Sequence, residues 1–230
     1  MNSNTRKYLF IALFIAASLL TIYFVYSLVA FGSPLSKTMR QHLVNGNEFH
    51  KDSLFDKAAE SYFKSEALEK DNPVANYNLA TNIAVKNNAL PKEGRNNDVV
   101  IDDYLYADTV FTQVIAKDTV KANVANSWRN MGVMYHRIAN DKELDMLLVQ
   151  KIDSIAKNNP DADVDGYTPG GDRYSLLKAK KAYENSLRID PGNEETRYNL
   201  AVVNYLLKKE QQQRQNQQQN QQQQQNNQQE

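Results

Sequence analysis

An acidic loop in the C-terminal half of the 230-residue chain has the residue types and spacing best suited to chemistry. Within residues 161–172, aspartates stand at positions 1, 3, 5 and 12, and Gly166 stands at position 6. This is the spacing of an EF-hand loop, whose oxygen atoms bind Ca²⁺. Position 12 of an EF-hand loop is usually a glutamate that binds Ca²⁺ with both oxygens, and the side chain of Asp172 is shorter. Pro169 also departs from the usual EF-hand loop sequence. The pattern favours a polar insertion loop and leaves a Ca²⁺-responsive binding module as the alternative.

Elsewhere the sequence lacks the motifs of catalysis and of metal binding. The chain has no cysteine, which excludes disulfides, thiolate metal sites and a cysteine nucleophile. It also lacks phosphate-binding glycine loops, the nucleophile elbow and the HExxH zinc motif. We therefore expect no enzyme, no catalytic or metal-binding residue, no cofactor and no small-molecule substrate. Because the formal net charge is zero, we do not expect nucleic acid as a partner either.

The strongest structural signal is the window WRNMGVMY at 128–135. Trp128, Met131 and Tyr135 recur at i, i+3 and i+7, which places them on one face of a helix. Gly132 leaves room for a second helix to approach closely. This pattern is typical of the first helix of a tetratricopeptide repeat (TPR), where Trp128 is a core residue rather than a ligand-stacking one.

Related windows recur along the chain. Counterparts of Met131-Gly132 stand at Leu79-Ala80 and Leu200-Ala201, with a degenerate copy at Asn45-Gly46. The first two copies are 34 residues apart, which is one TPR period, and the later spacings are 52 and 69. The second helix of a repeat carries a small residue four positions before an aromatic residue. Three such pairs occur: Ala58 with Tyr62, Ala107 with Phe111, and Ala179 with Tyr183.

These copies predict an all-α solenoid of three repeats over residues 41–209, closed by a capping helix at 194–209. The longer spacings require two insertions. The first, at about 87–102, is rich in Asn, Pro and Gly and is predicted to be a loop. The second, at 140–173, has apolar residues at helical spacing between Glu143 and Lys157, so we expect an extra amphipathic helix before the acidic loop.

The N-terminus carries a long apolar run without charged residues at 8–31. At about 1.5 Å per residue, such a helix spans a bilayer core of roughly 30 Å. Arg6 and Lys7 favour a cytoplasmic N-terminus at 1–7, which places the repeats on the far side of the membrane. We expect an uncleaved anchor followed by a linker at 32–40. A signal peptide cleaved before Ser33 is the alternative.

The C-terminal segment 210–230 consists almost entirely of Gln and Asn. From Gln211 to Glu230, 18 of 20 residues are of these two types. Such a segment cannot bury a core, so we expect a disordered tail, with a helical continuation out of Lys209 left open. A self-association tail is the alternative.

The order of these features resembles the BatC-like TPR proteins of the Bat (Bacteroides aerotolerance) system. The resemblance rests on the stretches NMGV at 130–133 and ETRYNLA at 195–201 running into the Gln-rich tail, and it covers about residues 40–215. It implies a bacterial cell-envelope protein beside membrane proteins with von Willebrand A domains and a MoxR-type ATPase. With the topology above, the protein is expected in the inner membrane, single-pass, with its TPR domain in the periplasm. The two insertions depart from the compact family pattern.

The first helices line the groove of a TPR stack, so the predicted function is a scaffold that docks an extended or helical segment of another envelope protein. Arg129 and Arg137 are eight residues apart and can receive a carboxylate of a partner peptide, although ordinary exposed charges are the alternative. The predicted partner-binding residues are Tyr77, Thr81, Arg129, Val133, His136, Arg137, Tyr198 and Val202.

Overall fold

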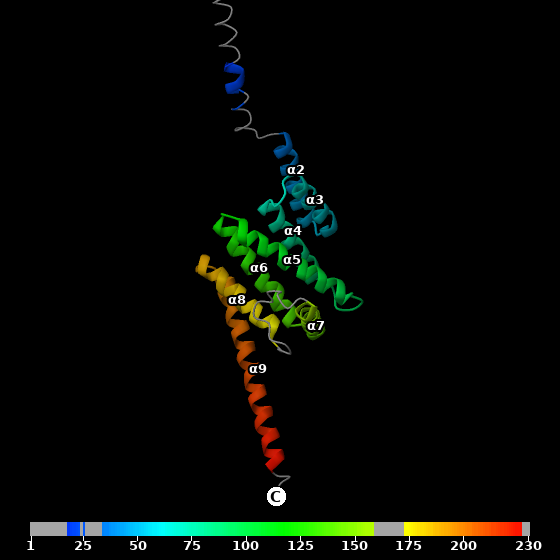
Figure 1. Ribbon diagram of the computed structural model, residues 1–230, viewed down its shortest axis with the longest axis vertical. Helices are drawn as coiled ribbons and strands as arrows, with labels where there is room; N and C mark the ends of the chain where they lie inside the picture. Colours follow the sequence, from blue (N-terminus) through cyan, green and yellow to red (C-terminus); the bar gives the residue numbers. More distant parts are fainter. Residues whose placement is uncertain (1–17, 24, 26–33, 159–172, 227–230) are drawn as a thin grey trace, which may run out of the picture.

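The computed structural model describes residues 18–23, 25, 34–158 and 173–226 (Figure 1). The acidic loop at 161–172 and most of the predicted anchor at 8–31 lie outside these residues. None of the described helices is long and apolar enough to cross a membrane. The labelled helices are α2 (Pro34–Lys51), α3 (Phe55–Leu68), α4 (Pro73–Ala89), α5 (Asn97–Lys117), α6 (Lys121–Ala139), α7 (Lys142–Asn158), α8 (Tyr174–Ile189) and α9 (Glu194–Asn226).

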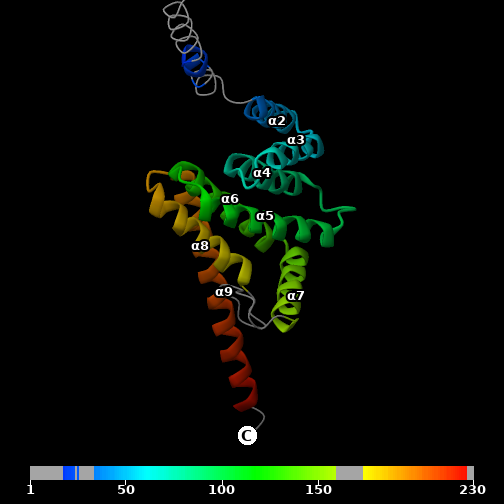
Figure 2. The same ribbon diagram turned by 45° about the horizontal axis from the view of Figure 1, so that its top comes forward.

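The helices pack in pairs, as the repeated windows predict. Helix α2 lies against α3, α4 against α5, and α6 against α8 (Figures 1 and 2). The third pair forms across the inserted helix α7. The first helices of successive pairs also contact one another: α2 lies against α4, α4 against α6, and α6 against α9. We call this series of first helices the inner row.

Small residues and buried tyrosines make the closest contacts within the pairs. A Cβ atom added to Gly46 would lie 2.4 Å from Cε1 of Tyr62, and one added to Gly132 would lie 2.5 Å from Cε1 of Tyr183. Both tyrosines are almost fully buried. The small and aromatic positions recognised in the sequence are therefore the points where the two helices of a pair meet.

The first insertion is more helical than the expected loop at 87–102. Helix α4 continues to Ala89 and α5 begins at Asn97, so only residues 90–96 connect them. The Asn96 side chain accepts a hydrogen bond from the backbone N–H of Val99 at 3.3 Å. The Asn pair at 96–97 therefore marks the start of a helix, because asparagine caps the free N–H groups there.

The second insertion supplies α7, which covers the N-terminal half of α5. Its buried side chains, Leu144, Leu148 and Ile152, recur every four residues and face the core. Lys151 of α7 pairs with Asp102 of α5 at 2.5 Å. The two insertions therefore pack against each other and extend the stack sideways (Figure 2).

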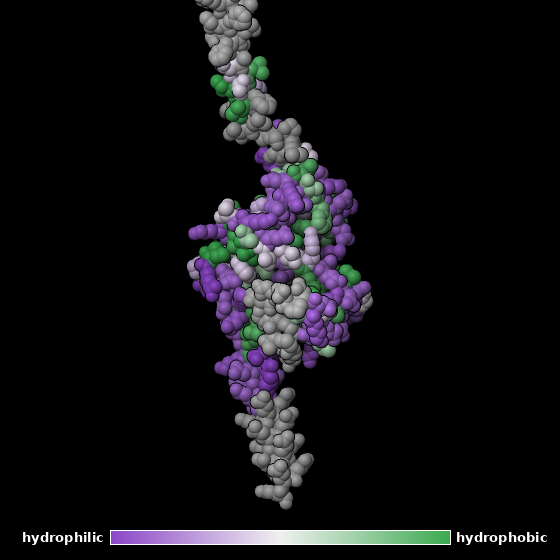
Figure 3. Space-filling model, viewed as in Figure 1, coloured by the Kyte–Doolittle hydropathy of each residue, from purple (hydrophilic) through white to green (hydrophobic). Residues whose placement is uncertain are grey.

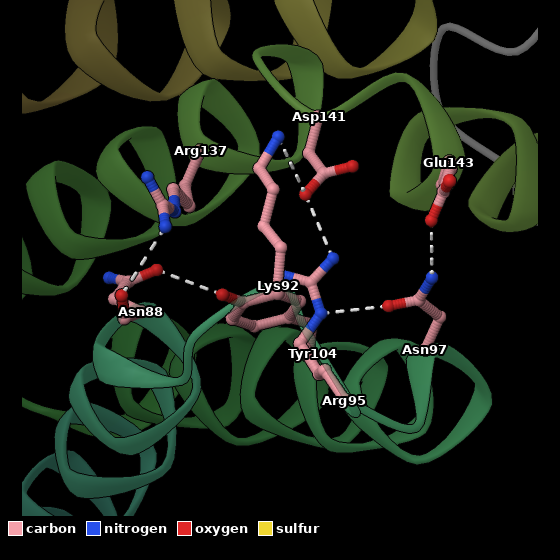
Figure 4. Close-up of polar contacts among 8 residues, drawn as sticks. All are labelled: Asn88, Lys92, Arg95, Asn97, Tyr104, Arg137, Asp141 and Glu143. Carbon is pink, nitrogen blue, oxygen red and sulfur yellow. Dashed lines mark hydrogen bonds and ion pairs between the residues drawn. The ribbon is translucent and has the colours of Figure 1, made fainter.

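A polar network joins the loop of the first insertion to the start of the second (Figure 4). Arg95 Nη2 lies 2.8 Å from Asp141 Oδ2, and both side chains are almost completely buried. Arg95 Nε also donates to Asn97 Oδ1 at 2.7 Å, and Asn97 Nδ2 donates to Glu143 Oε2 at 3.0 Å. This chain of contacts fixes the loop at 90–96 against the end of α6.

Both ends of the repeat region are more helical than expected. Helix α2 begins at Pro34, inside the predicted linker at 32–40, because proline has a helical φ and needs no partner for an N–H in the first turn. Helix α9 continues through the Gln-rich segment to Asn226, as the helical continuation out of Lys209 would require. Glutamine is a good helix former, and the packed start of α9 provides the nucleus from which the helix propagates.

Candidate partner-binding groove

Amide side chains connect the helices of the inner row. Asn78 Nδ2 donates to Asn47 Oδ1 at 3.0 Å, which joins α4 to α2. Asn130 Nδ2 donates to Thr81 Oγ1 at 3.1 Å and to the Tyr77 hydroxyl at 3.3 Å, which joins α6 to α4. Asn78 and Asn130 each precede the apolar residue of their sequence window. The repeat therefore places the same type of bond between successive first helices.

A hollow of about 180 Å³ opens on the inner row between α2 and α4, and it is lined by Asn47, His50, Tyr62, Asn78 and Thr81. The Tyr62 hydroxyl donates to Asn47 Oδ1 at 2.9 Å. Burial raises the pKa of Tyr62 to about 12, so this hydroxyl keeps its proton at neutral pH. Asn47 Oδ1 thus accepts two hydrogen bonds, and its amide nitrogen is oriented by them.

The histidine of this hollow is also held by an asparagine. His50 Nδ1 lies 2.8 Å from Asn82 Oδ1, while Asn82 Nδ2 donates to the backbone oxygen of Phe55 at 2.9 Å. Because the amide oxygen can only accept, the imidazole donates through Nδ1. In the neutral ring with this tautomer, Nε2 is the acceptor.

The amide row, which we define as Asn47, Asn78 and Asn130, retains unused hydrogen-bonding capacity. Within the part of the chain that the structure describes, Asn47 Nδ2, Asn78 Oδ1 and Asn130 Oδ1 have no hydrogen-bond partner. Neither free oxygen is among the described buried, unpaired atoms. One donor and two acceptors along the row match the C=O and N–H groups of an extended peptide backbone.

The predicted groove residues on α4 and α6 lie on or beside the amide row. Tyr77 packs edge-on against Phe111 with ring centres 6.4 Å apart, and its hydroxyl accepts from Asn130 together with Thr81. Val133 is half-buried against the main core. His136 packs edge-on against Tyr183, and burial lowers the pKa of His136, which favours the neutral ring at pH 7.

The two predicted arginines contact different helices. Arg129 Nη1 lies 3.5 Å from Glu195 Oε2 of α9. Arg137 is exposed, and its Nη2 donates to the backbone oxygen of Asn88 near the end of α4 at 3.5 Å. A partner carboxylate would therefore compete with Glu195 for Arg129. This geometry favours a structural role for Arg129 in joining α6 to α9.

The last two predicted residues lie on α9, where the groove ends. The Tyr198 side chain is 71% exposed, and Val202 is half-buried. Within the described residues, neither side chain forms a hydrogen bond with the amide row. Tyr77 and Thr81 therefore lie on α4, and Val133 and His136 lie on α6, whereas Tyr198 is exposed on α9, the last helix of the inner row.

No family model matches this chain, and no curated protein sequence does. One solved structure that matches is described as the first TPR of Spaghetti (RPAP3) bound to the HSP90 peptide SRMEEVD. The match has a TM-score of 0.47 and 17% sequence identity, and it covers 75% of this chain and 94% of that chain.

The described helices form a TPR-like stack. The helix pairs follow the predicted order, and Gly46 and Gly132 meet the aromatic residues of their partner helices. A stack of this kind presents surfaces for other proteins.

A second hollow, of about 440 Å³, lies between α5 and α8 and was not predicted from the sequence. Trp128 and Met131 contribute apolar lining, and Trp128 also packs against the main core. Asp108 lines the hollow; its Oδ1 is buried without a hydrogen bond within the described residues, and burial raises the pKa of its carboxyl. Periodicity along a single helix cannot reveal such a space, because its lining comes from three helices, α5, α6 and α8.

Among the described residues, no group of three or more His, Asp or Glu side chains is placed to hold a metal ion. The predicted Ca²⁺-binding alternative concerns 161–172 and stays a prediction.

Proposed function

We propose that this protein is a membrane-anchored scaffold that docks an extended segment of another envelope protein along its inner row. The observation that carries the proposal is the amide row, in which bonds between helices orient three asparagine side chains and leave a donor and two acceptors unused. Recognition would then use the partner's backbone, with side-chain selectivity from neighbouring residues such as His50 and Val133. No catalytic step is part of this proposal.

The proposed setting is the periplasmic face of a bacterial inner membrane, with residues 8–31 as the anchor. Arg6 and Lys7 support this topology through the positive-inside rule. The described residues 18–23 and 25 are helical, and their large apolar side chains are exposed: Leu19, Leu20, Ile22, Tyr23 and Val25. Figure 3 shows this mostly hydrophobic stretch apart from the repeat helices. Exposed apolar side chains of this kind suit a lipid environment.

The proposed partners are membrane proteins with von Willebrand A domains in a Bat-like complex that contributes to aerotolerance. The support is the sequence resemblance alone: the NMGV and ETRYNLA stretches followed by the Gln-rich tail. Crosslinking of the full chain in native membranes, followed by mass spectrometry, tests this setting. Recovery of other partners only, or loss of residues 1–32 from the membrane-bound protein, would contradict it.

The docking surface is tested with two variants in a pull-down from native membranes. Asn78→Ala/Asn130→Ala removes two amides of the row, and Asn185→Ala removes an amide from α8 as a matched control. A hydrogen bond contributes about 1 kcal/mol, so losing two of them should weaken partner binding about thirtyfold, while Asn185→Ala leaves it unchanged. Circular dichroism of each variant checks that the helices still form.

Arg129→Glu/Arg137→Glu separates backbone docking from capture of a carboxylate. We expect this variant to retain most partners, because both arginines already have contacts within the chain. Loss of binding in the arginine variant with full binding in the asparagine variant would overturn the amide-row proposal.

A further inference from the structure

The last helix of the inner row, α9, has two opposite faces of different character. Thr196 and Val203 are fully buried against the rest of the stack, with Leu200 and Leu207 half-buried beside them. At 100° per residue, Tyr198, Ala201 and Tyr205 lie on the opposite side of the helix. The two tyrosine side chains are 71% and 64% exposed, and Ala201 is exposed as well.

This exposed face is the one that a second helix covers in the preceding repeats. Ala201 occupies the position of Gly46 and Gly132, which lie directly beneath Tyr62 and Tyr183 of their second helices. On α9 the small residue is open and flanked by two exposed aromatics. The chain cannot cover this face from residues 210–230, because that segment contains no apolar residue.

The ends of the same face carry opposite charges. Glu194 lies at the N-terminal end of the Tyr198–Ala201–Tyr205 stripe, and Lys208 and Lys209 lie at its C-terminal end; all three are exposed. A helix with a negative start, an aromatic centre and a positive end is complementary to itself when a second copy runs in the antiparallel direction. An unlike helix would have to carry the same order of charges to bind antiparallel, or the reverse order to bind parallel; a second copy carries the required order by identity.

We propose that the exposed face of α9 binds a second copy of this chain, with the two α9 helices antiparallel about a two-fold axis between Ala201 and Val202. Tyr198 of each copy then packs against the partner's Tyr205, and Glu194 meets the partner's Lys208 and Lys209. Such a contact is isologous, as in most dimers of identical chains. It places the two repeat stacks on either side of the paired α9 helices.

The contact is expected to be weak in dilute solution. The stripe from Glu194 to Lys209 is about 22 Å long at 1.5 Å per residue, which puts the interface at the low end of specific interfaces. Anchoring both copies in one membrane would raise their local concentration and favour the pair.

A crosslinking experiment on the full chain in native membranes tests the geometry. Since the chain has no cysteine, Ala201→Cys introduces one reporter at the axis, and Glu60→Cys introduces a matched reporter on the exposed surface of α3. With a short bismaleimide, Ala201→Cys should give a dimer at least tenfold more efficiently than Glu60→Cys. Equal yields, or an Ala201→Cys adduct only to an unlike protein, would overturn the proposal.

A charge exchange adds a test that does not depend on the introduced thiol. Size-exclusion chromatography with light scattering is run on the detergent-solubilised full chain, alone and mixed. Glu194→Lys and Lys208→Glu/Lys209→Glu should each be monomeric at concentrations where the wild type dimerises, and their equimolar mixture should recover the dimer. No recovery in the mixture would contradict the antiparallel register. The Asn78→Ala/Asn130→Ala variant should dimerise normally, which separates this contact from partner docking.

Discussion

Arg95 and Asp141 form a buried ion pair at 2.8 Å although they are 46 residues apart in the sequence. Arg95 belongs to the loop of the first insertion, and Asp141 immediately precedes the inserted helix α7 (Figure 4). The segments that lengthen the second and third repeats therefore stabilise each other. This explains how a repeat stack tolerates both insertions: each one satisfies the polar groups of the other.

Replacing one partner of this pair should destabilise the whole domain. Arg95→Met leaves the Asp141 carboxylate buried without its cation, and the expected loss is about 3 kcal/mol in the free energy of unfolding. Lys92→Met is the matched control, because Lys92 is 61% exposed and lies 3.5 Å from the same carboxylate. It should cost about 0.5 kcal/mol or less. Urea denaturation measures both, and equal effects would contradict the assignment.

The same pair should make stability depend on acid pH. Burial by itself raises the pKa of Asp141, but the hydrogen bond and charge of Arg95 outweigh it and hold the pKa below the ordinary value of 3.8. The unfolded chain therefore binds this proton more readily than the folded one. The contribution is complete well above pH 3.8 and is lost as the pH falls through the lower folded value.

Asp141→Asn provides the comparison for that pH effect. The urea midpoint of the wild type should fall more steeply than that of the variant as the pH is lowered from about 5 to 2. Parallel curves for the two proteins would show that Asp141 titrates alike in the folded and unfolded states.

Gly132→Ala tests the close approach of α6 and α8. The added methyl group would lie 2.5 Å from Cε1 of Tyr183, whose side chain is fully buried. Overpacking costs about 1–3 kcal/mol, while the better helix propensity of alanine returns up to about 1 kcal/mol. We expect a net loss of about 1–2 kcal/mol. Gly192→Ala, with its nearest contact at 3.6 Å, should stay within about 0.5 kcal/mol.

The Gln-rich part of α9 should contribute helix but little stability. A chain that stops after Glu210 lacks residues 211–230, of which Gln211 to Gln213 are exposed. Its thermal midpoint should stay within about 2 °C of the full chain, while the circular dichroism signal at 222 nm falls by the share of the removed helical turns. A drop of many degrees would show that the tail packs against the repeats.

Local periodicity sufficed to predict the helix pairs. The spacing of Met131, Gly132, Ala179 and Tyr183 identifies the two helices of the third pair even though α7 stands between them. A period of 3.6 residues and a small residue facing an aromatic one are properties of short segments, so they can be read from the chain directly. The apolar spacing at 143–157 likewise indicated the helix that the structure shows as α7.

The limits of the insertions were less predictable from the same signals. Asparagine, proline and glycine between 87 and 102 mark a turn, yet Asn96 also serves as a helix cap. Composition alone cannot separate these two roles, because the same side chain suits both. Likewise, a glutamine-rich segment on its own is typical of disorder, but glutamine is also a good helix former. After Lys209 it follows a packed helix and continues it.

The amino-acid sequence by itself determined the all-helical class, the phase of the repeats and the faces that become buried, since these follow from residue type and spacing along one helix. Only the tertiary structure decided which polar groups meet: Arg95 with Asp141, Asn78 with Asn47, and Arg129 with Glu195. Those partners come from segments far apart in the chain. Their meeting depends on how the helices stack and on how the insertions fold over them, which no local pattern encodes.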